Sequence, residues 1–342
     1  MQRDFYKRIW DGLDAGKRSV LLTVLGEQGA QKRLFYEDMF AGEPDGPHTA
    51  LAKAAFEKSE LSYLPLPGGY AAFAEPFVPE PRLIVLGGGH IALPLVEFAA
   101  KCGFAVTVVD DRPAFANALR FPLAHEVVCE SFERVFPKLR LDPYCFVVVI
   151  TRGHRHDKMC LRELTKYPLA YLGMIGSKNR VRTVKDSLLE EGVAEEVLNK
   201  ICAPIGMKIG AVTPSEIAVS ILAEVILYKR TLNKEAWPEL DREVLFALKE
   251  AKEAPFAIVT IIEAKGSAPR GAGAKLLVWP DGRIAGSIGG GCSEGEAMKA
   301  AYEVIRTGSP CVYGVDLSGA AAEDEGMVCG GRIKVAIERY DG

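Results

Sequence analysis

The sequence predicts an α/β protein: a Rossmann-like parallel-sheet domain flanked by a small α+β domain and by a degenerate N-terminal copy of that domain. Two observations in the 342-residue chain lead to this prediction. Strand and helix patterns alternate over residues 82–230 around a glycine-rich turn, which is typical of a parallel sheet covered on both faces. The segments on either side of that region also resemble each other, which indicates an internal repeat.

The glycine-rich turn follows an apolar strand, precedes a helix pattern, and has the spacing Gly87-x-Gly89-x-x-Ala92. Gly87 permits the sharp turn, Gly89 lets the backbone approach a pyrophosphate, and Ala92 lets the helix pack close to the strand. Amides at the helix start near His90 would face the phosphates, with the helix dipole behind them.

An acid stands where a Rossmann fold holds the ribose. Asp110 ends the second apolar strand, roughly 20 residues after the turn, where a carboxylate can accept from a ribose hydroxyl. Asp110 favours NAD(H), whereas the nearby Arg112 would suit the 2′-phosphate of NADP(H). The sequence therefore predicts NAD(P) as a candidate ligand of this domain.

Two linkers divide the chain. Prolines crowd the end of the N-terminal segment, in residues 76–81, and residues 231–239 separate the Rossmann pattern from the C-terminal segment. We therefore expect domains at 1–78, 79–232 and 233–342. In the Rossmann region, further strands are expected at 125–129, 145–150 and 169–174, with helices at 157–166, 178–190, 194–199 and 214–229. Thr213 and Glu216 predict a capping box on the last helix.

The repeat aligns SVLLTVLGEQGAQKR (19–33) with FAIVTIIEAKGSAPR (256–270) at a constant offset, and this places Arg33 beside Arg270. Further on, the N-terminal ALAKAAFE corresponds to EAMKAAYE. Where the C-terminal copy has Cys292 and Glu294, the N-terminal copy has Gly46-Pro47-His48, and Pro67 replaces Cys329, so the cysteine-bearing loops survive only in the C-terminal copy. We therefore place the chemistry in the C-terminal copy and treat the other as a scaffold. A shortened copy that takes its complement from a second chain would make a homodimer.

Composition excludes several classes of function. The net charge of −3 shows no basic surface for nucleic acid. No apolar run reaches the roughly 18 residues of a membrane span, and the amphipathic N-terminus lacks the core of a signal peptide. We therefore expect a cytoplasmic protein with no nucleic-acid partner and no membrane span. The eight cysteines show no C-x-x-C pair, so most are expected to be small core residues.

Three glycine-flanked segments of the C-terminal domain suit close approach to an anionic ligand. They are Gly266 to Arg270, Gly286 to Glu294 and Val328 to Gly331, and they include Gly290, Gly291, Cys292, Cys329 and Gly330. A helix start lowers the pKa of a thiol such as Cys292, and Arg270 could contact a phosphate. Alternatively, the glycines only form turns and both cysteines pack as small apolar residues. Two cysteines beside glycines, both absent from the copy, favour a ligand site.

The Rossmann region has its own candidates at the carboxyl ends of strands. His154, His156 and Asp157 follow a strand and could form a metal site or an acid–base group. Alternatively, Asp157 caps the next helix and His154 satisfies a turn. Residues 173–178 are either a second anion site or a plain turn with Ser177 as the N-cap. Residues 204–206 and 213–216 are expected to be structural.

The motifs together resemble a known family. GGGH, VDDR, TRGHRHD, YLGMIGSK, PIGMKIGAVTPSEIAVSILAE, GSAPRGAGAKLLV, GSIGGGCSE and CGG are similar to those of the XdhC/CoxI family of accessory factors for xanthine dehydrogenase and related molybdenum hydroxylases. The resemblance covers nearly all of residues 80–342. In that family the cysteine-bearing domain usually precedes the Rossmann domain, whereas here the intact copy comes last.

This resemblance implies a protein that binds molybdenum cofactor, protects it during sulfuration and delivers it to an apo molybdenum hydroxylase. It implies cofactor contact, and contact with the molybdenum, by Cys292 and Cys329, with Glu294 and Arg270 at the pterin site. A cysteine desulfurase is a further expected partner. No catalytic residue is assigned, because proteins of this kind are similar to chaperones and are not clearly enzymes.

Two alternatives remain. An NAD(P)-dependent oxidoreductase would use Gly87, Gly89 and Asp110 for the nucleotide and His154 or His156 as the acid–base group. A non-catalytic Rossmann scaffold would serve only dimerisation and docking of a client protein. The cysteine loops favour cofactor handling over both.

Overall fold

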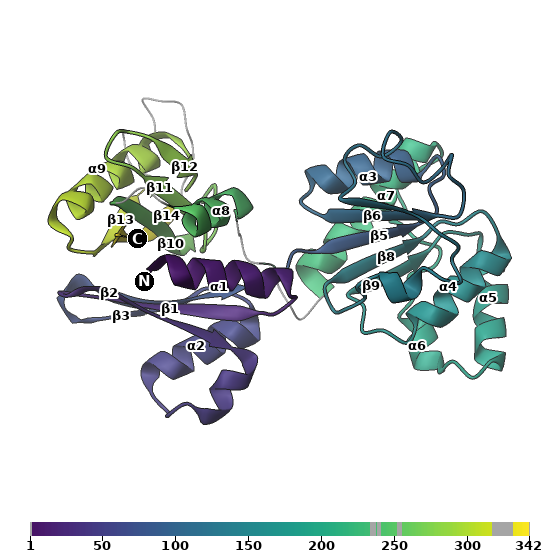
Figure 1. Ribbon diagram of the computed structural model, residues 1–342, viewed down its shortest axis with the longest axis horizontal. Coiled ribbons are helices and arrows are strands. Elements are labelled where there is room, and N and C mark those ends of the chain that lie inside the picture. Colours follow the sequence, from purple (N-terminus) through teal and green to yellow (C-terminus); the bar gives the residue numbers. More distant parts are fainter. Residues whose placement is uncertain (1, 233–236, 238–240, 252–254, 317–330, 342) are drawn as a thin grey trace. The chain divides into compact units, whose positions relative to one another are not determined.

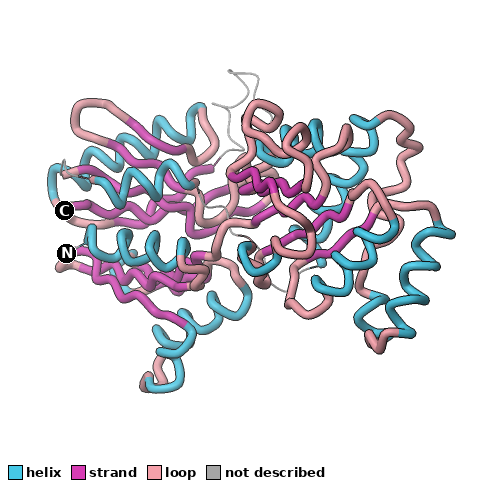
Figure 2. The backbone as a smooth tube through the Cα atoms, turned by 45° about the vertical axis from the view of Figure 1, so that its right-hand side comes forward, coloured by secondary structure: helices cyan, strands magenta, loops and turns pink. Residues whose placement is uncertain are grey.

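The computed structural model describes residues 2–232, 237, 241–251, 255–316 and 331–341. The chain divides into two compact units: unit 1 joins Met1–Pro79 to Glu235–Gly342, and unit 2 is Glu80–Lys234. Unit 2 contains a parallel sheet, and unit 1 contains two antiparallel sheets (Figures 1 and 2). This arrangement confirms the predicted α/β fold class with a Rossmann-like domain.

The sheet of unit 2 has the strand order β7-β6-β5-β8-β9, the order of a Rossmann fold. The central strand β5 pairs with β6 on one side and β8 on the other, so the winding reverses between β5 and β8. Ligands of such folds bind at the carboxyl ends of the strands beside this switch point. The strands are β5 (Arg82–Leu86), β6 (Ala105–Asp110), β7 (Glu126–Cys129), β8 (Cys145–Val149) and β9 (Tyr171–Met174).

Helices cover both faces of this sheet (Figure 1). On one face α3 packs against α7, and on the other α4, α5 and α6 share a core with the strands. The helices are α3 (Ala92–Lys101), α4 (His154–Leu164), α5 (Lys178–Glu190), α6 (Glu195–Asn199) and α7 (Pro214–Leu227). The predicted capping box at the start of α7 is confirmed, since Thr213 accepts from the Glu216 amide and Glu216 accepts from the Thr213 amide.

One helix start was predicted wrongly. The sequence indicated a helix from Asp157, but α4 begins at His154 and its N-cap is Gly153. Gly153 has extended backbone angles and no side chain to mark the start, whereas Asp157 resembles a capping residue. Asp157 therefore lies in the first turn of α4 and is not its cap.

The N-terminal half of unit 1 (residues 2–79) forms an antiparallel sheet of order β2-β1-β4-β3. Helix α2 covers one face through a core that includes Val20, Ala55 and Phe56. The elements are α1 (Gln2–Asp14), β1 (Ser19–Gly26), β2 (Gly29–Tyr36), α2 (Pro47–Lys58), β3 (Ser62–Pro65) and β4 (Ala71–Phe77).

The C-terminal half (described residues 237–341) forms a second antiparallel sheet, of order β12-β11-β10-β14-β13. Helix α9 packs on it through Ala297, Ala301 and Val304. The elements are α8 (Arg242–Glu250), β10 (Phe256–Lys265), β11 (Lys275–Val278), β12 (Ile284–Gly286), α9 (Gly291–Thr307), β13 (Cys311–Asp316) and β14 (Arg332–Tyr340).

The two sheets share one register. Thr23 of β1 lies opposite Lys32 of β2, and Thr260 of β10 lies opposite Lys275 of β11. The strands on the other side of β1 and β10, β4 and β14, also match, because Leu21 pairs with Glu75 and Ile258 pairs with Glu338. Strands β1, β2 and β4 therefore correspond to β10, β11 and β14.

The register corrects one detail of the repeat. The constant offset paired Arg33 with Arg270, but Arg33 lies inside β2 opposite Leu22, while Arg270 lies in the loop between β10 and β11. The N-terminal half turns directly from Gly26 to Gly29 where the C-terminal half has residues 266–274. A loop present in only one half therefore breaks the constant offset.

A core joins the two halves. Helix α1 packs against α8, and apolar side chains of both helices and of strands β1 and β10 fill a common core, which includes Tyr6, Leu21, Leu245, Phe256 and Ile258. A second cluster, with Leu25, Phe73, Ile262 and Ala336, brings the sheets into direct contact. Because both halves contribute apolar side chains to these cores, the halves form one compact unit.

Candidate functional site

The glycine turn after β5 is closely packed on its inner side. Gly87 has φ +114°, and a Cβ there would lie 2.5 Å from the Ile150 carbonyl oxygen at the end of β8. A side chain at Gly88 would overlap the Phe115 carbonyl. Around Gly89 no described atom lies within 4 Å of the Cβ position, and the adjacent His90 is exposed. The turn is therefore open toward solvent at Gly89, where the sequence places a pyrophosphate.

Asp110 is 2% exposed and its carboxylate is fully engaged. It accepts from the Gly88 amide at 2.8 Å and from the Arg112 guanidinium at 2.8 and 2.9 Å. Burial acts to raise the pKa of Asp110, but the hydrogen bonds from Arg112 and Gly88 outweigh it and hold the pKa below its ordinary value. A ribose hydroxyl would have to share these oxygens, so the predicted ribose contact stays a prediction.

The segment after β6 folds over the glycine turn and brings a second arginine to it. Arg120 donates to the Gly88 carbonyl at 3.1 Å, and the Arg112 guanidinium stacks 3.6 Å from the centre of the Phe115 ring. Two cations thus lie beside the turn. The sequence did not indicate Arg120, because it belongs to an irregular segment with no periodic pattern.

Asp157, in the first turn of α4, connects the segment after β8 to helix α5. It is fully buried, accepts from the Thr151 hydroxyl at 2.5 Å and forms an ion pair with Arg180 of α5. His156 packs against Phe132, with ring centres 5.3 Å apart. In the described part of the chain no group of three His, Cys, Asp or Glu side chains could hold a metal. The side chain of His154 lies outside the described residues, so this trio has no geometry to report.

The turn after β9 matches its structural interpretation. Ser177 caps α5 by accepting from the Arg180 amide at 3.3 Å. Gly206 of the next segment donates its amide to Glu224 of α7. These contacts hold the edge of the sheet together, as expected for segments of structural function.

In the C-terminal half, the glycine segments come together at one end of the sheet. A Cβ on Gly289 would lie 3.0 Å from Pro269, and one on Gly331 would lie 2.9 Å from the Ser267–Ala268 backbone. Gly331 is the first described residue after positions 317–330, and it directly precedes β14. Segments 266–270 and 286–291 and Gly331 therefore form one loop cluster, which we call the glycine cluster.

Glu294 of α9 organises this cluster. One carboxylate oxygen accepts from the Ser287 hydroxyl at 2.6 Å and from the Ile288 and Gly290 amides at 3.0 Å each. A nearly ideal set of donors for an anion is thus occupied by the carboxylate of the protein itself. Glu294 holds the loop, and a ligand of the glycine cluster would approach beside it.

The remaining predicted site residues are placed only in part. Arg270 is half-buried in the loop after β10. Gly291 and Cys292 form the first turn of α9, where the side chain of Cys292 lies outside the described residues. Cys329 and Gly330 also lie outside them. The contacts predicted for both cysteines, including contact with molybdenum, stay predictions.

A Rossmann unit and an antiparallel unit with a glycine cluster define a two-part α/β protein. Residues 83–225 match the XdhC Rossmann domain, and residues 250–316 match the XdhC and CoxI family. The chain belongs to the XdhC and CoxI family.

Several known proteins are similar to parts of this chain. A Bacillus subtilis protein named as a probable subunit of xanthine dehydrogenase is 31% identical over 66% of this chain and 65% of its own length. The uncharacterized protein YqeB of Escherichia coli is 35% identical over 61% of this chain and 38% of its own. The molybdenum cofactor insertion chaperone PaoD of Escherichia coli is 35% identical over 24% of this chain and 26% of its own.

A solved structure also resembles the chain. The crystal structure of a xanthine dehydrogenase from Bacillus halodurans is 29% identical, covers 65% of each chain and has a TM-score of 0.51. The chain thus spans less than two thirds of the length of each of these relatives. Among the described helices, none combines the length and the apolar character that crossing a bilayer requires.

Proposed function

We propose that this chain binds molybdenum cofactor, protects it during sulfuration and delivers it to an apo molybdenum hydroxylase of the xanthine dehydrogenase type. Two relatives support this, since one is named as a probable subunit of xanthine dehydrogenase and the other as a molybdenum cofactor insertion chaperone. The observation that carries the proposal is the glycine cluster, in which two glycine-rich segments and Gly331 meet.

The described residues of the glycine cluster fit a pterin with a phosphate group. Gly290 has φ +76°, and no described atom lies within 4 Å of its Cβ position, so a ligand can approach the backbone there. Arg270 would provide the positive charge that a phosphate prefers. Glu294 fixes the amides of the loop, which keeps the open side of Gly290 in place without a ligand.

The two cysteines would hold the metal end of the cofactor. The cofactor brings a molybdenum centre, for which soft thiolate sulfurs are suitable ligands. Cys292 lies in the first turn of α9, where the helix dipole favours the thiolate form. Cys329 precedes Gly331 of the cluster by two residues.

The test is a transfer assay. The protein is loaded with cofactor in the presence of a cysteine desulfurase and mixed with an apo-hydroxylase, and the hydroxylase activity is measured. Cys292→Ala and Cys329→Ala should each lower the activity at least about tenfold, since loss of even an outer-shell partner of a metal ligand typically costs that much. Cys311→Ala, on β13 of the same sheet, is the matched control and should leave it unchanged. Full transfer by both site variants would exclude a role for these thiols.

Nucleotide binding by unit 2 is a second candidate, favoured by the Rossmann strand order and the open position at Gly89. Arg112 neutralises Asp110, so the site would not repel a 2′-phosphate as a free carboxylate does. Titration calorimetry with NADH and NADPH tests this candidate. Heat of binding with either would support it, and none with both would make the turn architectural.

A further inference from the structure

Two buried ion pairs connect the halves of unit 1. Lys275 donates to Glu75 at 2.5 Å and to the Thr260 hydroxyl at 2.8 Å. Lys32 donates to Glu338 at 2.7 Å and to the Thr23 hydroxyl at 3.1 Å. The charged side chains are at most 5% exposed, so each ammonium depends on its carboxylate for compensation.

The two pairs are equivalent by register. Each lysine pairs across the sheet with the threonine of its own half. Its glutamate comes from the other half: Glu75 lies on β4, which pairs with β1, and Glu338 lies on β14, which pairs with β10. Glu75 of the N-terminal half therefore does for Lys275 what Glu338 of the C-terminal half does for Lys32.

Only one of these lysines adjoins the glycine cluster. Lys275 begins β11 directly after the loop that carries Arg270, and that loop is closed by the Gly273 amide, which donates to the Ile261 carbonyl at 2.8 Å. The next residue of β11, Leu276, pairs with Gly286, where the second glycine segment starts. Lys275 is thus fixed between two of the segments that form the cluster.

The other lysine has no such neighbour. Lys32 follows the tight turn from Gly26 to Gly29. Its partner Glu338 lies on the order of 20 Å along β14 from Arg332, the first strand residue after the cluster. Loss of this pair would leave Lys275, and with it the loop at Gly273, still compensated by Glu75.

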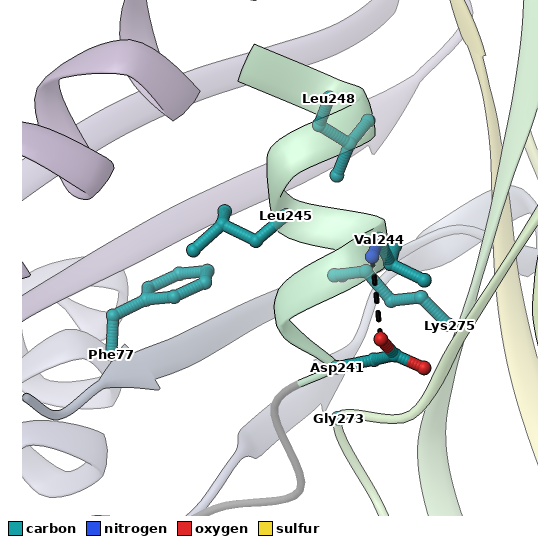
Figure 3. A pocket seen from close by; sticks show the side chains of 7 residues that line it. All are labelled: Phe77, Asp241, Val244, Leu245, Leu248, Gly273 and Lys275. Carbon is teal, nitrogen blue, oxygen red and sulfur yellow. Dashed lines mark hydrogen bonds between the residues drawn. The ribbon is translucent and has the colours of Figure 1, made fainter. Parts of the chain in front are cut away.

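From this asymmetry we infer that Glu75 is a positioning residue for the cofactor site of the other half, an inference that rests on the proposed function. Without Glu75, the ammonium of Lys275 is buried and uncompensated, which strongly disfavours its present position. A pocket beside it is lined by Gly273 and by Asp241, whose carboxylate caps α8 (Figure 3). Lys275 would turn toward this carboxylate and pull on the loop at Gly273, so the cluster would lose its geometry.

The test compares Glu75→Gln with Glu338→Gln in the full chain. Each variant removes one buried carboxylate from an equivalent position, so both should lower the melting temperature to a similar degree. Hydrogen exchange should increase in residues 271–274 only in Glu75→Gln. Binding of molybdenum cofactor released from a molybdenum hydroxylase should weaken about tenfold in Glu75→Gln and stay near wild type in Glu338→Gln.

A double variant separates positioning from general destabilisation. Glu75→Gln with Lys275→Met removes both charges, so the force that moves the loop disappears and slow exchange in residues 271–274 should return. Equal exchange in the two single variants, or no recovery in the double variant, would overturn the inference. If wild-type protein does not bind the cofactor, the proposed function fails, and the exchange data alone then decide whether Glu75 positions the loop.

Discussion

The two halves of unit 1 have the same strand register and equivalent buried ion pairs, and each contributes one helix, α1 or α8, to the shared core. Their loops differ at one end of each sheet. The N-terminal half closes β1 and β2 with a tight turn at Gly26–Gly29, and it joins β3 to β4 through residues 66–70. The C-terminal half has residues 266–274 and 317–330 at the corresponding connections. Both halves contain the strands and the helix that form the shared core. The longer loops that form the glycine cluster occur only in the C-terminal half.

This difference indicates that the N-terminal half has a structural role and that the C-terminal half carries the candidate site. The N-terminal half contributes Tyr6, Leu21 and Phe77 to the shared core, and Glu75 to the pair next to the cluster. It therefore occupies the place that a second copy of the C-terminal half would take. The homodimer was predicted because a second chain would complete the shortened copy, but its complement lies in the same chain. The dimer itself stays a prediction, which sedimentation can check.

The largest expected effect tests the equivalence of the ion pairs. Lys32→Met and Lys275→Met each leave a buried carboxylate without its partner, which should lower the free energy of unfolding by about 3–5 kcal/mol. Urea unfolding of the two variants should give losses that agree within about 1 kcal/mol, since the two environments match. A large loss in one variant and none in the other would break the comparison.

A smaller effect tests the difference between the halves. Glu294→Ala removes the acceptor of three hydrogen bonds in the glycine cluster, which should lower the free energy of unfolding by about 1–3 kcal/mol. Alignment of ALAKAAFE (50–57) with EAMKAAYE (296–303) places His48 of α2 at the position of Glu294, and His48→Ala should change the free energy of unfolding by less than about 0.5 kcal/mol. Thermal unfolding measures both. Equal losses would mean that Glu294 has no special task in the loop.

The smallest effect concerns a contact at one end of the interface. Glu263 accepts from Tyr63 of the other half at 3.0 Å and pairs with Lys265 and Lys334. The hydrogen bond from Lys265, with those from Tyr63 and Lys334, lowers the pKa of Glu263. Its stabilisation is therefore complete above the unfolded pKa near 4.3 and is lost as the pH falls through the lower folded value.

Glu263→Gln should thus reduce stability near neutral pH by less than about 1 kcal/mol, because the carboxylate is partly solvated. The difference between variant and wild type should vanish in acid. Urea unfolding at pH 7 and pH 3 measures it. A difference that grows toward low pH would contradict the assigned direction of the pKa shift.

The Rossmann unit could be predicted from sequence because its signals are local. Gly87, Asp110 and the capping residue Thr213 each occur at a short fixed spacing from the elements that they define. The start of α4 was missed because Gly153 carries no side-chain signal, while Asp157 resembles a cap. The burial of Asp157 beside Arg180 depends on tertiary contact with α5, which no local pattern indicates.

The interface and the organisation of the glycine cluster depend on long-range contacts. Lys275 and Glu75 are 200 residues apart in sequence, and no periodic pattern connects them. Sequence comparison found the repeat but could not locate the loop that interrupts it, so it paired Arg33 with Arg270. Glu294 was predicted as a ligand contact, while the structure shows its carboxylate bound to the amides of its own loop.

Native mass spectrometry of protein purified without oxygen from cells that make molybdenum cofactor tests the central claim most directly. We predict a wild-type species heavier by the mass of one pterin cofactor, and loss of that species in Cys329→Ala but not in Cys311→Ala. Wild-type protein that carries no pterin, or a Cys329→Ala variant that carries as much as wild type, would contradict the proposed function.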